Sequence, residues 1–328
     1  MKPVLRANDI GIGHSATAIL QHLNFALYPG DFVCLMGSNG RGKTTLLRTL
    51  CGQLPLIRGT IELQQHSLHS LAASQLSRHM AVVLTERLDL PHMTVKEFVA
   101  LGRAPHTGFW GSLRAEDWEA VDRALKDLQI EELAQRPFNQ LSDGQKQMVL
   151  VARAVAQETA IILLDEPTNF LDMPHKMNLL SLLKKIATER RTAILFSSHD
   201  WDLVTEMCTL VWLVDLHGKL QVGMPEEIIL WGDLSLAFET HHIHFSRELG
   251  RFVEPKNFTH HVKLMADDPL HRQWIAHALA KEGVGIDADA KTVVTCKTND
   301  QEYTINRTEQ SLNSLYHLIW AIKKSEIN

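Results

Sequence analysis

The chain has 328 residues, which suggests about two domains and leaves ample length for a large core. Hydrophobic residues make up 45% of it and charged residues 22%, so a disordered chain is excluded. The formal net charge of −5 argues against a non-specific nucleic-acid-binding protein, which is usually basic. Four well-separated cysteines without a CxxC pair indicate neither a disulfide framework nor a cysteine zinc site, and they fit a cytoplasmic protein. We expect no signal peptide and no membrane helix, because no apolar run approaches ~20 residues.

Up to about residue 240 the sequence alternates between strand-like and helix-like patterns. The expected strands lie at 18–28, 32–36, 59–63, 160–164, 192–196 and 210–214. A turn is expected at 29–31, a helix near Leu46, and a mostly helical stretch at 94–128. The last helix of this stretch has one apolar face, formed by Trp118, Val121, Leu125 and Leu128. Repeated strand–helix units predict an α/β fold with a mostly parallel sheet covered on both faces.

After about residue 240 the composition changes, and several of the 18 histidines cluster there. The tail predicts strands at 261–265, 292–296 and 302–306, helices at 269–281 and 311–323, and a turn at 298–300. The last helix is expected to bury the face formed by Leu312, Leu315, Tyr316, Ile319 and Ile322. Residues 241–328 are therefore expected to form a small appended α+β domain.

The segment 37–44 matches the phosphate-binding pattern G-x-x-x-x-G-K-[ST], between a predicted buried strand and a predicted helix. Glycines let consecutive N–H groups point at phosphate oxygens, and the helix N-terminus adds partial positive charge. Lys43 is expected to neutralise the β- and γ-phosphates, Thr44 to ligate Mg²⁺ and Thr45 to lie on the α-phosphate side. The expected nucleotide-binding residues of this loop are Gly37, Ser38, Asn39, Gly40, Gly42, Lys43, Thr44 and Thr45.

The apolar strand expected at 160–164 runs into two acids, Asp165 and Glu166. A carboxylate at the C-terminal end of such a strand can hold Mg²⁺ opposite a phosphate-binding loop, and Asp165 fits that role. Glu166 is then well placed to act as general base for an attacking water.

These motifs, with three others, resemble those of ABC ATPases. Residues 141–145 (LSDGQ) are similar to the family's LSGGQ signature, and 165–172 (DEPTNFLD) to its second acidic motif and D-loop. His199 stands where the family has its switch histidine. The order and spacing agree over 1–240, which implies an ABC-type P-loop ATPase domain with a helical subdomain at about 88–158. A phosphate-binding loop alone would leave kinases and GTPases open.

The signature sequence also predicts a local structure. Ser142 heads a predicted helix, and Ser-x-x-Gln is a capping-box pattern, so this helix N-terminus is a second candidate anion site. In ABC ATPases such a site binds the γ-phosphate of the ATP that the other subunit holds. The resemblance implies that role for Ser142, Asp143, Gly144 and Gln145. The chain has one phosphate-binding loop and one signature, so a complete site requires two chains.

The resemblance implies two further roles. His199 is expected to contact the γ-phosphate and to help hold Glu166 and the water. Asp172, in the D-loop, is expected to face the dimer interface and couple the two sites.

Three positions depart from the family pattern. Asp143 replaces a glycine, which we expect to be harmless because aspartate tolerates positive φ. His14 stands in place of the aromatic that stacks on adenine; it either stacks or is a surface loop residue. Thr85 stands in place of the Q-loop glutamine, so either the adjacent Glu86 substitutes for it or the coupling is rearranged.

Residues 95–106 and the Trp110-Gly111 pair resemble ATPases that drive uptake of iron chelates, haem and vitamin B12. This implies ATP and Mg²⁺ as cofactors and a membrane permease docked on 85–112. It also implies, indirectly, a substrate-binding protein and a place at the cytoplasmic face of the inner membrane, and the negative net charge predicts no nucleic-acid partner. The alternatives are the ATPase of another transporter, such as an exporter, and a soluble ABC ATPase. DNA-repair members carry a long coiled coil and ribosomal members two ATPase units, and neither feature is present.

The role of 241–328 is open to three interpretations. His241, His242 and His244 suggest metal sensing, but a strand would place His241 opposite the other two, with no acidic or cysteine partner nearby. A solvated linker is the simpler interpretation of the cluster. For the domain as a whole we expect a regulatory or dimer-stabilising role.

Overall fold

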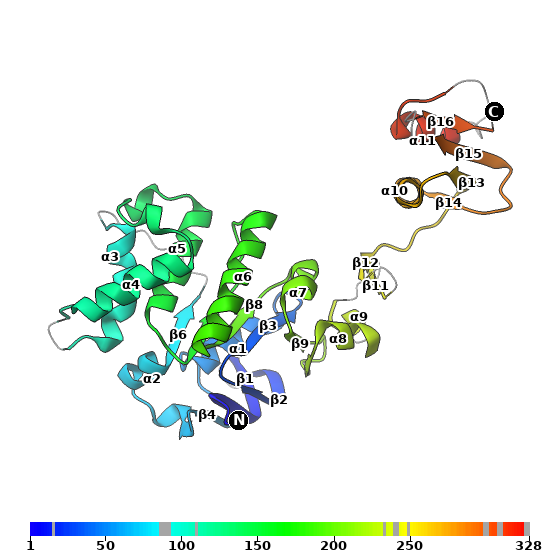
Figure 1. The fold of residues 1–328 in the computed structure, drawn as a ribbon. Helices are drawn as coiled ribbons and strands as arrows, with labels where there is room; N and C mark the ends of the chain where they lie inside the picture. The colour runs from blue at the N-terminus through cyan, green and yellow to red at the C-terminus, as the bar shows by residue number, and fades with distance from the viewer. Residues whose placement is uncertain are drawn as a thin grey trace. The chain divides into compact units, whose positions relative to one another are not determined.

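The computed structural model describes residues 1–14, 17–84, 93–108, 111–231, 234–238, 243–247, 250–297, 302–306 and 311–324. They form two compact units, Met1–Phe252 and Val253–Asn328 (Figure 1). The division lies after the expected residue 240, because Phe245 is buried in the core of the first unit. None of the described helices is long and apolar enough to cross a membrane.

The first unit is built on a six-stranded sheet with the order β10-β9-β3-β8-β7-β6. Its strands are β3 (Phe32–Gly37), β6 (Met80–Val83), β7 (Ile161–Leu164), β8 (Ala193–Ser197), β9 (Leu210–Val214) and β10 (Leu220–Gly223). All neighbouring pairs for which the register is known are parallel except β9 and β10. The predicted parallel sheet is thus present, with β6 and β10 in addition to four of the expected strands. The other two expected strands, at 18–28 and 59–63, belong to a second sheet.

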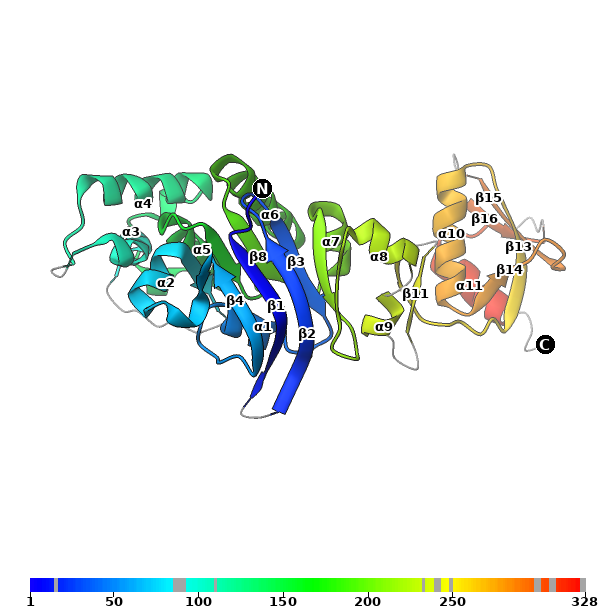
Figure 2. The same cartoon turned by 90° about the horizontal axis from the view of Figure 1, so that it is seen from below.

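A second, antiparallel sheet has the order β2-β1-β4-β5. It consists of β1 (Leu5–His14), β2 (Thr17–Leu27), β4 (Arg58–Leu63) and β5 (His66–Ser67), and Figure 2 shows β1 and β2 side by side. The sequence did not predict β1, although Leu5, Ile10 and Ile12 are buried.

The continuous apolar runs of the central strands are explained by two cores. Cys34 and Met36 of β3 belong to one core cluster, whereas Val33 and Leu35 belong to the other. Because successive side chains of a strand point to opposite faces, such a strand must be apolar at every position. These strands end together at one edge of the sheet, where the motifs of the phosphate-binding loop and the paired acids follow.

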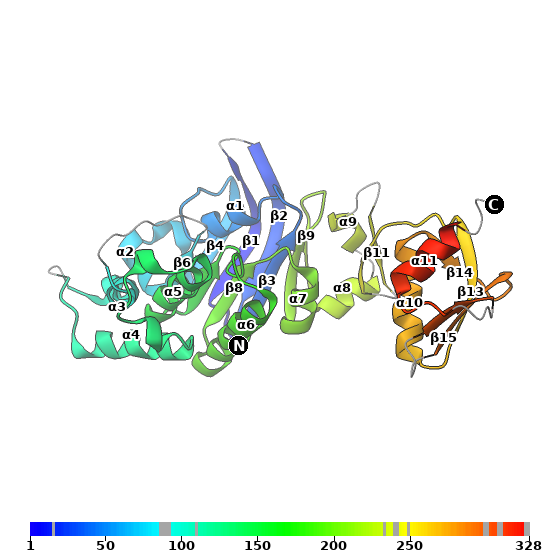
Figure 3. The ribbon, with the colours of Figure 1, turned by 90° about the horizontal axis from the view of Figure 1, so that it is seen from above.

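Helices cover this sheet and form a separate layer at one end of the unit. The helices are α1 (Lys43–Leu50), α2 (Ala73–His79), α3 (Val95–Ala100), α4 (Ala115–Asp127), α5 (Asp143–Ala156), α6 (Met173–Arg190), α7 (Trp201–Met207), α8 (Pro225–Trp231) and α9 (Leu234–Phe238). Short 3₁₀ turns lie at η1 (Leu68–Ser70), η2 (Leu101–His106), η3 (Glu131–Leu133) and η4 (Phe138–Gln140). Figure 3 shows α3 and α4 far from α8, at the opposite end of the unit.

The expected apolar face of α4 is present except at its start. Val121, Leu125 and Leu128 are buried, but Trp118 is 37% exposed, with the Lys96 ammonium 5.7 Å from its ring centre.

The second unit has a sheet with the order β14-β13-β15-β16 and two helices. Its elements are β13 (His260–Ala266), α10 (Pro269–Lys281), β14 (Val284–Ile286), β15 (Thr292–Lys297), β16 (Glu302–Ile305) and α11 (Leu315–Lys324). Two short strands, β11 (His244–Ser246) and β12 (Arg251–Val253), pair at the end of the first unit. The sequence missed β14, and the expected turn at 298–300 lies outside the described residues.

One expectation for the last helix was wrong. Tyr316 is 74% exposed, whereas Leu318 is fully buried beside Ile322. Both residues fit an apolar stripe of helical period, and the direction of the sheet decides which of them faces the core.

Candidate active site

The phosphate-binding loop joins β3 to α1, and its glycines adopt backbone angles that other residues rarely adopt. Gly40 has a φ of 76° and Gly42 of 90°, in the left-handed region. A Cβ on Gly42 would also lie 3.0 Å from a methyl carbon of Ile19. The loop therefore needs glycine for both its turn and its close approach to β2.

The Lys43 side chain folds back over this loop. Its Nζ donates to the carbonyl oxygens of Gly37 at 2.6 Å and Ser38 at 3.2 Å. Burial lowers the pKa of Lys43, and the nearby carboxylates of Glu166 and Asp165 oppose that shift. The ammonium thus lies between the loop and two acids, a position from which it can meet a phosphate.

Thr44 and Asp165, both predicted to hold Mg²⁺, are in contact. The Thr44 hydroxyl donates to Asp165 Oδ2 at 2.9 Å, and Asp165 is only 5% exposed. A hydroxyl and a carboxylate this close are the hard oxygen ligands that Mg²⁺ prefers, so the donor set fits the expected ion.

Ser197, at the end of β8, links the two acids. Its hydroxyl donates to Asp165 Oδ1 at 2.6 Å and accepts a hydrogen bond from the Glu166 amide at 2.8 Å. Glu166 has a φ of 51°, an uncommon value for a residue with a side chain. Ser197 therefore supports a strained residue of the site. The sequence analysis missed it, although its position at the end of a parallel strand was a usable signal.

The side chains of Glu166 and His199 also meet. His199 Nδ1 lies 2.9 Å from Glu166 Oε2, and the histidine is largely exposed whereas the glutamate is not. With Nδ1 protonated, the imidazole donates to the carboxylate and leaves Nε2 free to face a ligand. This is the contact that the motif resemblance implied.

A cavity of about 530 Å³ gathers most of the predicted nucleotide-binding residues. Its lining consists of Ile19, Asn39, Gly40, Gly42, Lys43, Thr44, Thr45, Asp165, Glu166, Asn169 and His199. Ile19 and Asn169 were not predicted. Ser38 is absent from this lining, and its hydroxyl donates to the Ala237 carbonyl oxygen of α9 at 2.6 Å.

Six predicted positions lie wholly or partly outside the described residues. The backbone of His14 pairs with Thr17 at the end of β1, but its side chain is outside the described part of the structure. Thr85, Glu86, Trp110, His241 and His242 also lie outside it. Among the described residues, no group of three or more histidine, cysteine or acidic side chains could hold a metal ion.

The predicted capping box is present at the signature. Ser142 Oγ accepts from the Gln145 amide at 3.2 Å, and Gln145 Oε1 accepts from the Ser142 amide at 3.1 Å. Asp143 is the first residue of α5 and has no positive φ. The reason given for tolerating Asp143 was therefore wrong, because a residue in a right-handed helical turn needs no glycine-like freedom.

The signature lines a different cavity, of about 720 Å³. Ser142, Asp143, Gly144 and Gln145 share it with Phe170, Asp172 and His175, and none of its lining residues lines the first cavity. Asp172 caps α6 by accepting from the His175 amide at 3.1 Å, and its side chain remains 66% exposed. One chain therefore presents two separate half-sites.

A P-loop fold of this topology, with a signature helix that opens a second half-site, defines an ATP-binding subunit of the ABC type. The family model for ABC transporters matches residues 20–169. An uncharacterized ABC transporter ATP-binding protein of Methanocaldococcus jannaschii is 33% identical over 254 residues, which are 77% of this chain and 87% of the relative. The chain belongs to this family, and it is an ATPase, as the sequence predicted.

The chain is also similar to two relatives with named cargoes and to one solved structure. The iron(3+)-hydroxamate import ATP-binding protein FhuC of Bacillus subtilis is 36% identical over 60% of this chain and 73% of its own. The ferric enterobactin transport ATP-binding protein FepC of Escherichia coli is 34% identical over 69% and 83%. A metal-chelate type ABC transporter in an inward-facing conformation matches with a TM-score of 0.64 and 29% identity, over 77% of this chain and 96% of that one.

Proposed function

We propose that this chain is the ATP-hydrolysing subunit of an importer for an iron chelate, with haem and cobalamin as the alternative cargoes. The observation that carries this proposal is the likeness to the iron(3+)-hydroxamate and ferric enterobactin ATP-binding proteins, over 60% and 69% of this chain. The metal-chelate transporter structure adds to it. The subunit would act at the cytoplasmic face of the inner membrane, bound to permease subunits. A substrate-binding protein would deliver the cargo to those permease subunits. An exporter ATPase is the second candidate, and its cargo would move the other way.

The two half-sites favour a dimer as the working unit. The cavity with Lys43 and the cavity with Ser142 share no lining residue, so one chain cannot enclose a nucleotide between them. Two copies related by a twofold axis would pair each phosphate-binding loop with the partner's signature. In this arrangement the N-terminus of α5 meets the γ-phosphate, which the helix dipole favours.

Within each site, different residues bind the phosphates and activate the water. The loop amides and Lys43 hold the phosphates, and Thr44 and Asp165 would hold Mg²⁺, which would supply positive charge against them. Glu166 orients the water and takes its proton, while His199 fixes the Glu166 carboxylate through the 2.9 Å contact.

For the second unit we propose a regulatory or dimer-stabilising role. It has its own core, formed around Val262, Leu264, Ile275 and Leu318, so it can fold as a module. A module attached to a subunit that closes as a dimer can bias that closure.

An uptake assay tests the cargo and the direction together. A strain lacking this gene is supplied with a radiolabelled ferric siderophore, haem or cobalamin. We expect loss of uptake of one of them, restored by the wild-type gene and not by the Glu166→Gln variant. Normal uptake of all three would refute the proposed cargo class, and accumulation of an unrelated compound would favour the exporter.

A further inference from the structure

Ser38 of the phosphate-binding loop is hydrogen-bonded on two sides. Its hydroxyl donates to the Ala237 carbonyl oxygen of α9 at 2.6 Å, and Ala237 is fully buried in the core of the first unit. Its own carbonyl oxygen accepts from Lys43 Nζ at 3.2 Å. Two successive hydrogen bonds therefore connect α9 to the ammonium that is expected to bind the β- and γ-phosphates.

The segment that follows α9 reaches a second part of the nucleotide site. Phe252, the last residue of the first unit, has its ring centre 5.5 Å from that of Phe238 in α9 and 5.1 Å from that of Phe245 in β11. The Phe245 ring in turn packs edge-on against Trp201 at 5.9 Å. We call Trp201, Phe238, Phe245 and Phe252 the aromatic cluster.

The aromatic cluster meets the loop of the switch histidine at Trp201. This residue begins α7 two positions after His199, whose imidazole lies 2.9 Å from the Glu166 carboxylate. Trp201 is buried, and its Nε1 has no hydrogen-bond partner within the part of the chain that the structure describes. The position of the Trp201 ring therefore depends on packing, and Phe245 supplies an aromatic part of it.

A cavity of about 560 Å³ leaves room for this packing to change. Its lining includes Trp201, Phe238 and Phe252, together with His199. His199 also lines the nucleotide cavity, so the two cavities adjoin at this residue. Close-packed side chains transmit a displacement, and a neighbouring cavity gives aromatic rings space for a second arrangement. A shift of Phe252 can therefore change how α9 and Trp201 are held.

We infer that Ser38 is a positioning residue, and that α9 and the aromatic cluster together set the positions of Lys43 and His199 for ATP binding. Phe252 is followed directly by Val253, the first residue of the second unit. The aromatic cluster is then the route by which the second unit acts on the nucleotide site. This route rests on the regulatory role proposed above, whereas the role of Ser38 does not.

The first test variant is Ser38→Ala in the full chain, which removes the hydroxyl that donates to Ala237. A neutral hydrogen bond changes an equilibrium by about 2- to 10-fold, so the KM for ATP should rise by this factor while kcat stays within about twofold. Ser38→Thr keeps a hydroxyl, and its KM should stay within about twofold of wild type.

The ratio of the two kinetic constants separates positioning from a purely structural role. A structural role would lower the fraction of folded protein, and hence kcat, at an unchanged KM. An unchanged KM in Ser38→Ala, or an equal rise in Ser38→Ala and Ser38→Thr, would overturn the role of Ser38.

The second test variant is Phe252→Leu, which keeps an apolar side chain but lacks the ring that contacts Phe238 and Phe245. It should raise the KM for ATP by about threefold or more, within the usual range of coupling between sites. The matched control is Phe258→Leu, because the Phe258 ring contacts His261 outside the aromatic cluster. Its KM should stay within about twofold of wild type, and equal effects of Phe252→Leu and Phe258→Leu would overturn the role of the cluster.

Combining the two test variants shows whether they act through one route. If the aromatic cluster acts through α9 and Ser38, the double variant should raise the KM by clearly less than the product of the two single effects. A rise equal to that product would mean that the two act independently, and would overturn the shared route.

The route from the second unit is tested by inserting Gly-Ser-Gly-Ser after Val253. The insertion keeps every residue of the chain, but a flexible linker then separates Phe252 from the second unit. The KM for ATP should change by about threefold or more in the wild-type background and by less than about twofold in the Phe252→Leu background. Equal changes in both backgrounds would overturn the route. If the insertion has no effect on either kinetic constant in the wild type, the regulatory proposal fails with it, and the Ser38 variants still decide the positioning role.

Discussion

Removing the Ser197 hydroxyl should damage the active site without touching any phosphate-binding residue. In the Ser197→Ala variant Asp165 loses its 2.6 Å hydrogen bond, and the Glu166 amide loses its acceptor. Thr44 still donates to the other oxygen of Asp165, so the pair proposed to hold Mg²⁺ remains. The main consequence is for Glu166, whose left-handed backbone is no longer held by its amide.

The size of the effect follows from the two bonds. A hydrogen bond to a charged group contributes about 1.5–3 kcal/mol and a neutral one about 0.5–1.5 kcal/mol. We therefore expect the free energy of unfolding of the first unit to fall by about 2–4.5 kcal/mol. A general base contributes ~10²–10⁴-fold to the rate, so a displaced but intact Glu166 should reduce ATP hydrolysis by about 10- to 100-fold.

Steady-state ATPase assays and denaturation of the purified chain measure both effects. The matched control is Ser198→Ala: Ser198 is as buried as its neighbour, but its hydroxyl accepts from the Asp200 amide and touches neither acid. The control should keep most of its activity. Wild-type turnover in Ser197→Ala, or an equal loss in both variants, would refute the assigned role of Ser197.

Four further outcomes are expected. Glu166→Gln should bind ATP, form a stable dimer and lose hydrolysis by ~10²–10⁴-fold; near-normal turnover would remove Glu166 from its role. Lys43→Ala should weaken nucleotide binding. In the parent, affinity should fall as pH rises through the lowered pKa of Lys43, starting below its ordinary 10.5, and a flat profile by calorimetry would contradict this. The Arg114 amide and Arg103 lower the pKa of Asp117, so this carboxylate stabilises the fold above pH 3.8 and that contribution is lost on further acidification. On acidification below pH 3.8, the Asp117→Asn variant should lose less free energy of unfolding than the parent. Equal losses would argue against a stabilising role of the Asp117 carboxylate. Truncation after Phe252 should leave a folded, ATP-binding unit with altered basal ATPase or weaker dimerisation, and a truncated chain matching full length in both would refute the regulatory proposal.

The site of truncation illustrates the limits of the sequence. Composition changes at residue 240, but Phe245 packs edge-on against Trp201 at 5.9 Å and against Phe252 at 5.1 Å. These contacts lie within the first unit, and Trp201 follows His199 by two residues. A cut at 240 would remove part of that core, and composition alone could not reveal this because Phe245 and Trp201 are more than forty residues apart in the sequence.

What the sequence determined by itself was local. Glycine spacing specified the loop around Gly40 and Gly42, Ser142 and Gln145 specified a helix start, and apolar runs such as 32–36 specified strands buried on both faces. Each of these depends on the φ preferences or hydrogen bonds of residues within a few positions of one another.

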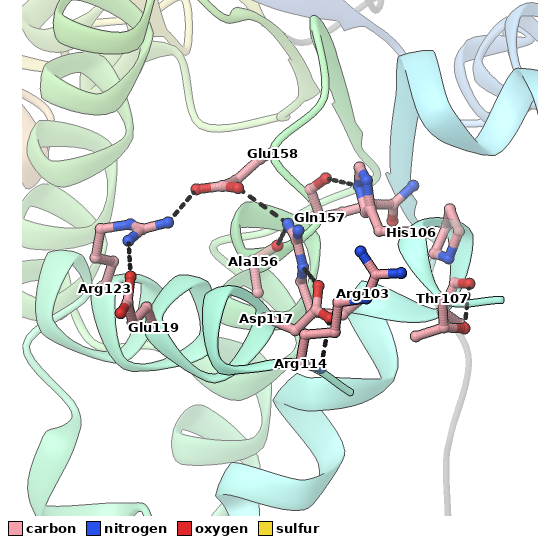
Figure 4. A network of polar contacts seen from close by, with 12 residues as sticks. Arg103, His106, Thr107, Arg114, Asp117, Glu119, Arg123, Ala156, Gln157 and Glu158 are labelled. Carbon is pink, nitrogen blue, oxygen red and sulfur yellow. Dashed lines mark hydrogen bonds and ion pairs between the residues drawn. The ribbon is translucent and has the colours of Figure 1, made fainter. Parts of the chain in front are cut away.

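Only the tertiary structure decided the long-range partners. Ser197 joins Asp165 and Glu166 across two strands, and Arg103 of η2 joins α4 to the end of α5 (Figure 4), because parallel strands and packed helices bring distant segments into hydrogen-bond distance. Such pairings depend on sheet order and helix direction, which no short stretch of sequence encodes. Sheet order and helix direction also place the cavity with Lys43 and the cavity with Ser142 apart within one chain.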